Sequence, residues 1–149
     1  MELVNFGVYM LTMIGIYGLL ALSLNLQLGF TGLINFGQVM FFAIGAYTSG
    51  LLTVDLGVPI PVAMVAAMLV TGAVGMLISL PTRSLKADYW AISTLVAAET
   101  VRLIAINEEW LTGGTFGVMN IPQPLEGLVG TTSYPLVFLG LTLALLAVV

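Results

Sequence analysis

The sequence predicts an all-α fold, a polytopic membrane helical bundle of about five transmembrane segments in which the second helix is interrupted. Of the 149 residues, 60% are hydrophobic and 7% are charged, whereas soluble domains carry about 25% charged residues. Apolar runs recur along the chain at about the 20-residue length that crosses a bilayer as a helix. Between Leu24 and Thr48 glycines and amides interrupt such a run, and membrane depth tolerates them only beside other helices or a water-lined cavity.

The first predicted span covers residues 3–26 and the second covers residues 34–54. A signal peptide is disfavoured for the first run because it carries Glu2 in place of a basic region and exceeds the usual apolar length. The second span ends where Asp55, Gly57 and Pro59 follow one another, since proline and glycine break helices.

The third predicted span, residues 61–80, ends at Pro81 and carries small side chains at every fourth position. Such a row lets two helix backbones approach closely in a membrane. The row is Ala63, Ala67, Thr71, Gly75 and Ser79, and its candidate helix-packing residues are Ala67, Thr71 and Gly75. Two interpretations are open, a static helix contact and a surface that slides during gating.

The fourth predicted span, residues 89–106, contains Glu99 and Arg102, the only charges well inside a predicted helix. A charge at the bilayer centre costs about 2.5–3.5 kcal/mol on insertion scales, so each side chain needs a partner or a cavity. Their spacing of three residues places them on one helix face, where they can pair. Three roles are open: a clamp between helices, direct contact of Glu99 with a translocated solute, and a pair that snorkels to the surface.

The fifth predicted span, residues 134–149, is shorter than the roughly 20 residues that a span needs. We therefore expect the natural protein to continue beyond this N-terminal portion, with a tilted or partial helix at a true terminus as the alternative. Arg83 and Lys86 share the short loop after the third span, and the positive-inside rule places that loop in the cytoplasm. The N-terminus and the connection 107–133 are then external, in a multi-pass protein of the cell membrane.

Polar side chains within the interrupted segment are candidates for a polar path or for hydrogen bonds between helices. Thr31, Gly32 and Asn35 also fit the start of a helix, where such residues cap free N–H groups. The candidates are Asn25, Thr31, Asn35 and Gln38.

Several chemistries are excluded by the composition. The chain has no cysteine and no histidine, which removes disulfides, thiol chemistry and the usual zinc and haem ligands. Three basic residues in all exclude a nucleic-acid footprint. The fourth span lacks the second carboxylate, histidine or metal ligands that would make Glu99 a catalytic acid. No phosphate-binding Gly-x-x-x-x-Gly-Lys-Ser/Thr loop occurs, so the chain is expected to be no enzyme and to need no cofactor.

Two motif blocks carry a resemblance to a known family. The stretches LNLQLGFTGLINFGQVMFFAIGAYTSGLL and ADYWAISTLVAAETVRLIAINEEWLTGGTFGVMNIP, in that order, resemble the LivM-type permease family of ABC importers for branched-chain amino acids. Relatives commonly carry Gly-His where this chain has Gly37 and Gln38, so a titratable role at that position is in doubt. The resemblance implies that residues 1–149 are the N-terminal portion of one permease domain, because the family places its ATPase-coupling loop in the C-terminal half.

The resemblance also implies a function and partners. Within the lipid bilayer, the chain would line part of the translocation path for branched-chain amino acids beside a second, LivH-like permease subunit. Its other partners would be two cytoplasmic ATPases and an external solute-binding protein. Alternatives are import of urea, amides or sugars by the same superfamily, and an ion channel or ion-coupled secondary transporter, which also uses interrupted helices. A purely structural scaffold is a third alternative, against which the density of polar groups at membrane depth counts.

Overall fold

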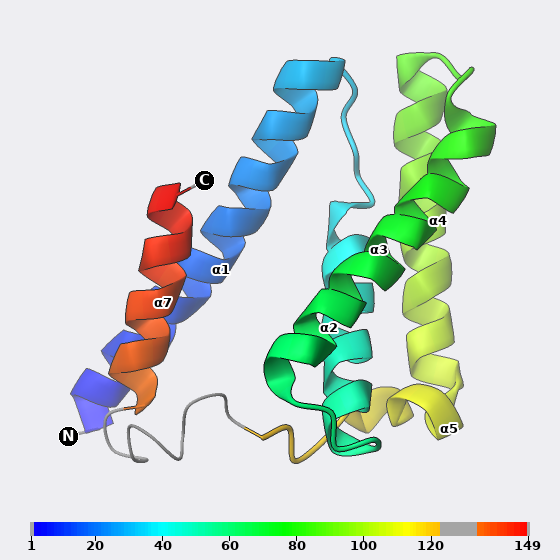
Figure 1. Cartoon of the computed structure of the whole chain (residues 1–149). Helices are drawn as coiled ribbons and strands as arrows, with labels where there is room; N and C mark the ends of the chain where they lie inside the picture. The colour runs from blue at the N-terminus through cyan, green and yellow to red at the C-terminus, as the bar shows by residue number, and fades with distance from the viewer. Residues whose placement is uncertain (1, 123–133, 149) are drawn as a thin grey trace. The chain divides into compact units, whose positions relative to one another are not determined.

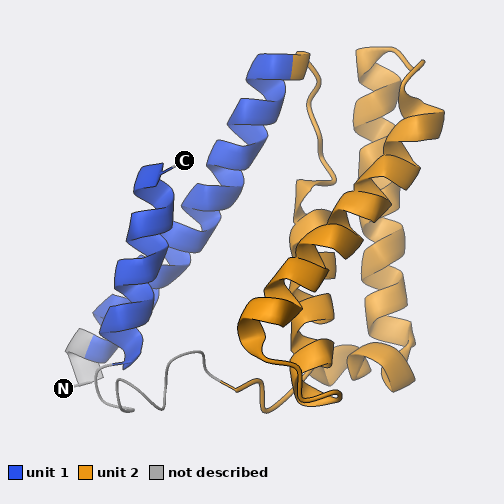
Figure 2. Ribbon diagram, in the orientation of Figure 1, with its two compact units in different colours: residues 1–30, 123–149 blue, residues 31–122 orange. Residues whose placement is uncertain are grey.

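The computed structural model describes residues 2–122 and 134–148, and all regular structure in that part of the chain is helical (Figure 1). This confirms the predicted all-α fold. The helices are α1 Glu2–Thr31, α2 Gln38–Val54, α3 Ile60–Thr82, α4 Ala87–Asn107, α5 Glu109–Thr112, the 3-10 turn η1 Gly114–Phe116, and α7 Tyr134–Val148. Residues 1–30 with 123–149 form one compact unit and residues 31–122 form the other (Figure 2). They are called unit 1 and unit 2.

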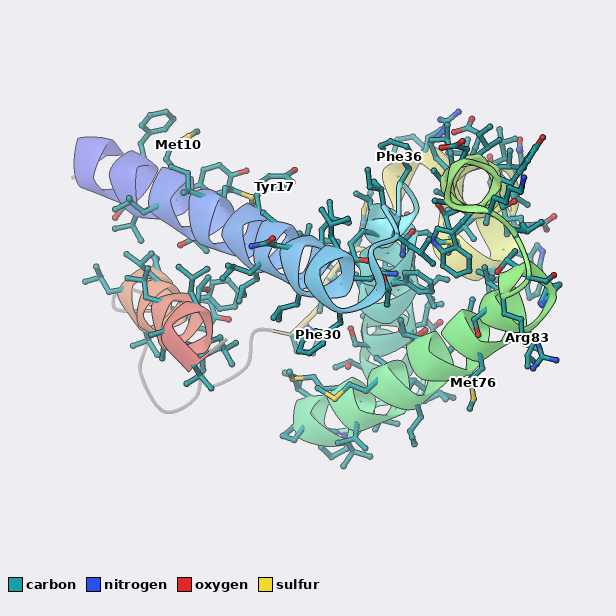
Figure 3. The ribbon with its side chains drawn as sticks, turned by 90° about the horizontal axis from the view of Figure 1, so that it is seen from above. Met10, Tyr17, Phe30, Phe36, Met76 and Arg83 are labelled. Atoms are coloured by element: carbon teal, nitrogen blue, oxygen red, sulfur yellow. The ribbon has the colours of Figure 1, made fainter. Side chains whose placement is uncertain are left out.

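Three helices are long and apolar enough to cross a membrane: Asn5–Thr31, α3 and α4. α2 and α7 are shorter apolar helices. Large apolar side chains stand out from the bundle, as Figure 3 shows for Met76, which is 71% exposed on α3. Apolar surface of this extent suits lipid or further helices better than water, as expected for a membrane bundle.

In unit 1, α7 packs against α1 through glycine. A Cβ atom placed on Gly15 would lie 2.7 Å from Cγ2 of Thr142, and one on Gly18 would lie 3.1 Å from a methyl group of Leu146. Thr142 is 4% exposed, and its hydroxyl donates to the carbonyl of Phe138 at 2.9 Å. The buried hydroxyl is therefore satisfied within its own helix, and the missing side chains on α1 let the two backbones come close.

In unit 2, α2 and α3 form a helical hairpin that packs beside α4 (Figure 1). Gly57, with a φ of +62°, provides the left-handed residue of the turn between α2 and α3. Pro59 precedes α3 and Pro61 lies in its first turn, where a missing N–H costs nothing. The helix does not stop at the expected end, Leu80: it includes Pro81 and ends at Thr82.

The break expected inside the second helix lies instead between α1 and α2. α1 continues past the expected end at Leu26 to Thr31, and α2 is continuous from Gln38. Gly32 has a φ of +67°, and the hydroxyl of Thr31 accepts a hydrogen bond from the N–H of Leu33 at 3.2 Å. Thr31 and Gly32 therefore end α1 rather than start α2, because a left-handed glycine closes a helix C-terminus.

Candidate functional site

A groove of about 310 Å³ runs between α2 and α4 in unit 2. Its wall is aliphatic except for a tyrosine and one pair of opposite charges. The lining residues are Val39, Met40, Ala43, Tyr47, Leu95, Ala98, Glu99, Val101, Arg102, Ala105 and Ile106. Small-molecule pockets start at about 300 Å³ and combine apolar walls with a few polar groups, so the groove suits a small solute with an apolar part and an ionic part.

The charges of the groove pair with each other along α4. Arg102 donates from Nε to Oε2 of Glu99 at 2.8 Å and from Nη2 to Oε1 at 2.6 Å, a two-pronged geometry that is stronger than a single ionic contact. The two side chains are 58% and 53% exposed. This ion pair lies within one helix, so it does not itself bridge two helices as a clamp would.

The loop before α2 contains a buried polar side chain and lies close against α4. Asn35 is 4% exposed; its Oδ1 accepts from the N–H of Gly37 at 2.8 Å, and its Nδ2 donates to Oε1 of Gln38 at 3.4 Å. A Cβ on Gly37 would lie 2.6 Å from the carbonyl oxygen of Thr94. The amide side chain thus satisfies the non-helical backbone of the loop where it lies against α4, as burial of polar backbone requires.

Thr94 is a site residue that the sequence analysis missed. It is 1% exposed, and its hydroxyl donates to the carbonyl of Ala91 at 2.9 Å. A threonine in an apolar helix resembles many others in the sequence, so nothing in the local pattern marks this one as the position that meets the loop.

The segment after α4 closes back onto α2. The hydroxyl of Thr112 donates to the carbonyls of Ala105 at 2.7 Å and Glu108 at 2.9 Å. Val118 and Ile121 lie against Gly50 of α2, and together with Ala46 and Tyr47 they line a small hollow. Tyr47 lines both this hollow and the groove, so the two lie on either side of one side chain of α2.

The small-residue row of α3 faces α2. Ala63 is fully buried and Ala67 is 6% exposed, and Gly75 lies beside the ring of Phe41. Oγ1 of Thr71 is buried with no hydrogen-bond partner in the described part of the chain. A second hollow of about 610 Å³ lies along this contact, but neither a carboxylate nor a cation lines it.

The other predicted polar residues lie elsewhere. Asn25 is exposed on α1, in unit 1, and Thr31 ends that helix. Unit 2 therefore brings Asn35 and Gln38 together, while the pair Glu99 and Arg102 lies in the groove. No group of three or more acidic, histidine or cysteine residues that could hold a metal ion occurs among the described residues.

Comparison with known proteins places this arrangement in a family. Residues 7–149 match the family model described as the permease component of branched-chain amino acid transport systems. The chain is 42% identical over 113 residues to the high-affinity branched-chain amino acid transport system permease protein LivM of Salmonella typhimurium, and 40% identical over 113 residues to that of Escherichia coli. A probable LivM permease of Methanocaldococcus jannaschii is 28% identical over 137 residues.

The matches cover most of this chain but a minor part of the relatives. They span 76% of the chain and 27% of each bacterial protein, and 70% of the chain and 40% of the archaeal protein. No solved structure gives a significant match. The family model nevertheless spans nearly all of the chain, including both helices of the groove. The chain accordingly belongs to the family of branched-chain amino acid transport permease components.

Proposed function

We propose that the chain is part of a transmembrane permease subunit of an ABC importer and that the groove between α2 and α4 lines the path of a branched-chain amino acid. The observation that carries this proposal is the pair of opposite charges in an otherwise apolar groove. The relatives, described as permease proteins of branched-chain amino acid transport, support the same solute class.

The chemistry of the groove complements such a solute. A branched-chain amino acid carries an ammonium, a carboxylate and an aliphatic side chain. The guanidinium of Arg102 is suited to bind the carboxylate in a two-pronged manner, and the carboxylate of Glu99 is suited to the ammonium. Val39, Ala43 and Leu95 supply apolar surface for the aliphatic part.

Pairing of the two charges with each other before a solute binds makes this binding feasible within a membrane. An isolated charge there is costly, and a bonded pair reduces that cost. When a zwitterion enters, one ionic contact within the protein is exchanged for two contacts with the solute, so no charge is left unpaired.

The proposed partners are those that the resemblance to permeases of ABC importers implies. Two separate cytoplasmic ATPases would supply the energy, a second permease subunit would form the other side of the path, and an external solute-binding protein would deliver the amino acid. Movement of the permease between outward-open and inward-open states would then expose the groove to each side in turn.

An uptake assay tests the proposal. The full-length permease is reconstituted with its partner subunits in vesicles containing ATP, and entry of labelled leucine is measured. Entry that needs ATP and is competed by isoleucine and valine supports the proposal. Competition by urea or a sugar instead, or an ion current without ATP, would contradict it.

A further inference from the structure

The segment after α4 presents a set of exposed apolar side chains. Trp110 of α5 and Phe116 of η1 are each 81% exposed, and Met119 is 58% exposed. These three residues are called the aromatic face. Exposed apolar surface of this kind, on a segment whose opposite side is packed, marks a surface that contacts something other than water.

The aromatic face is held on a fixed scaffold. The hydroxyl of Thr112 bonds to α4 and also accepts from the N–H of Gly114 at 3.2 Å. Thr112 and Gly114 are buried, and Val118 and Ile121 lie against α2. One side of the segment is therefore tied to α4 and α2, which leaves Trp110 and Phe116 directed outward.

The position of the segment identifies its surroundings. α4 is long and apolar enough to span a membrane, and α5 begins at Glu109, two residues after α4 ends at Asn107. α5 lies across the end of α4 (Figure 1). A short helix that crosses the end of a spanning helix lies at the depth of the membrane–water boundary, where tryptophan is enriched.

The bonding of the indole fits that depth. Nε1 of Trp110 donates to Oε2 of Glu108 at 2.6 Å, so the polar edge of the ring is satisfied and its apolar body is free to bury. Residues 108–122 contain no lysine and no arginine. Attraction to anionic lipid therefore cannot supply the binding, which has to come from burial of apolar area.

We propose that residues 109–121 form an in-plane membrane anchor whose aromatic face inserts into the boundary between lipid headgroups and acyl chains. The anchor would hold the end of α4, where Ala105 and Ile106 line the groove, at a fixed depth. Its contact with lipid would not need anionic headgroups, because residues 108–122 carry no basic side chain.

Tryptophan fluorescence tests this anchor. In the intact protein every tryptophan except Trp110 is replaced by phenylalanine, Trp90 included, and the protein is placed in phosphatidylcholine vesicles. Lipids brominated near the headgroup are expected to quench the Trp110 emission most strongly, because an in-plane segment buries its apolar face about 5–10 Å into the boundary of headgroups and acyl chains. Lipids brominated at the chain end and aqueous iodide should each quench less, and anionic lipid should not increase the quenching.

A second reporter separates insertion from a local effect at position 110. Phe116→Trp in a background without other tryptophans should give the same quenching order. Met119, the third residue of the aromatic face and 58% exposed, offers a further site for the tryptophan reporter if Phe116→Trp lowers the yield. Quenching of Trp110 by iodide but not by brominated lipid would overturn the anchor, because the segment would then lie in water. Protection from both quenchers would also overturn it, because protein would then cover the aromatic face.

Discussion

At the scale of single residues, the backbone carbonyl of Thr94 limits what can occupy position 37. A Cβ on Gly37 would come within 2.6 Å of that oxygen, a distance that real Cβ atoms do not adopt. Asn35 holds the same loop in place through the N–H of Gly37. The amide and the glycine thus perform one task, which is to let a non-helical backbone pack against α4.

Gly37→Ala is expected to destabilise the protein. The added methyl group meets backbone rather than a flexible side chain, so overpacking should lower the free energy of unfolding by about 1–3 kcal/mol. Gly29→Ala is the matched control, because a Cβ at Gly29 meets nothing within 4 Å and alanine favours a helix. Thermal unfolding in detergent measures the stability of both variants. An equal loss of stability in the two would show that the contact between Gly37 and Thr94 does not form.

The charged pair gives a second prediction at this scale. If Arg102 and Glu99 bind the two ends of the solute, Arg102→Gln and Glu99→Gln should each raise the KM for leucine about tenfold or more, the effect of losing one charge-assisted hydrogen bond. The double variant should not recover uptake, since both solute contacts are gone.

A purely structural pair predicts the opposite pattern. Each single change would then strand its partner and lower folded yield, and the double variant would restore part of the loss. Folded yield and the KM for leucine, measured on the unchanged protein, the two single variants and the double variant, distinguish the two roles. Recovery of both quantities in the double variant would contradict contact with the solute.

At the scale of elements, the contact between α2 and α3 depends on small side chains. Ala63→Leu adds volume where α3 is fully buried and outside the hollow, and it should cost about 1–3 kcal/mol. Ala73→Leu makes the same change at an exposed position of the same helix and should be nearly neutral. Assembled yield and unfolding temperature in detergent compare the two variants. Equal tolerance would mean that the four-residue spacing has no packing role.

The helices themselves were largely predictable, because length and apolar character alone determine which segments can lie in a membrane. α3 and α4 begin and end close to the spans expected from residues 61–80 and 89–106. The end of α1 was not predictable in the same way. Thr31, Gly32 and Asn35 are each compatible with either end of a helix, and the left-handed φ of Gly32 decides between them.

The site was predictable only in part, for a related reason. The sequence spacing of Glu99 and Arg102 identifies the pair on one face of α4. The groove that they line needs Val39, Ala43 and Tyr47 from α2 as well, and the approach of α2 to α4 depends on a loop contact with Thr94 that no local pattern encodes. The periodicity of a sequence predicts which residues share a face of one helix, whereas the groove is lined by residues of two helices.

At the scale of the whole molecule, charge separates between the two ends of unit 2. Arg83 and Lys86 lie at the turn between α3 and α4, while Glu108 and Glu109 lie at the far end of α4. Figure 3 shows Arg83 pointing away from the end of α3. The positive-inside rule predicts that the turn with Arg83 is cytoplasmic and that α5 is external.

Thiol labelling tests this orientation. Ser84→Cys and Thr115→Cys place single thiols at exposed positions of the two ends, in a chain without other cysteines. Thr115 is a better position than Gly113, whose φ of +75° and close contact with Gly117 disfavour a side chain. An impermeant reagent should label the thiol at position 115 in intact cells and the thiol at position 84 only in inverted vesicles. Labelling of both from one side would contradict the number of spans between them.

The most direct test of the central proposal, that the groove between α2 and α4 carries the amino acid, is protection of a thiol within it. Ala98 lines the groove, while Val96 lies on the same helix outside the groove lining. In the full transporter, modification of Ala98→Cys is expected to abolish leucine uptake, and saturating leucine should slow that modification. Modification of Val96→Cys should do neither. Leucine uptake that survives modification at position 98, or a modification rate there that leucine leaves unchanged, would contradict the proposal.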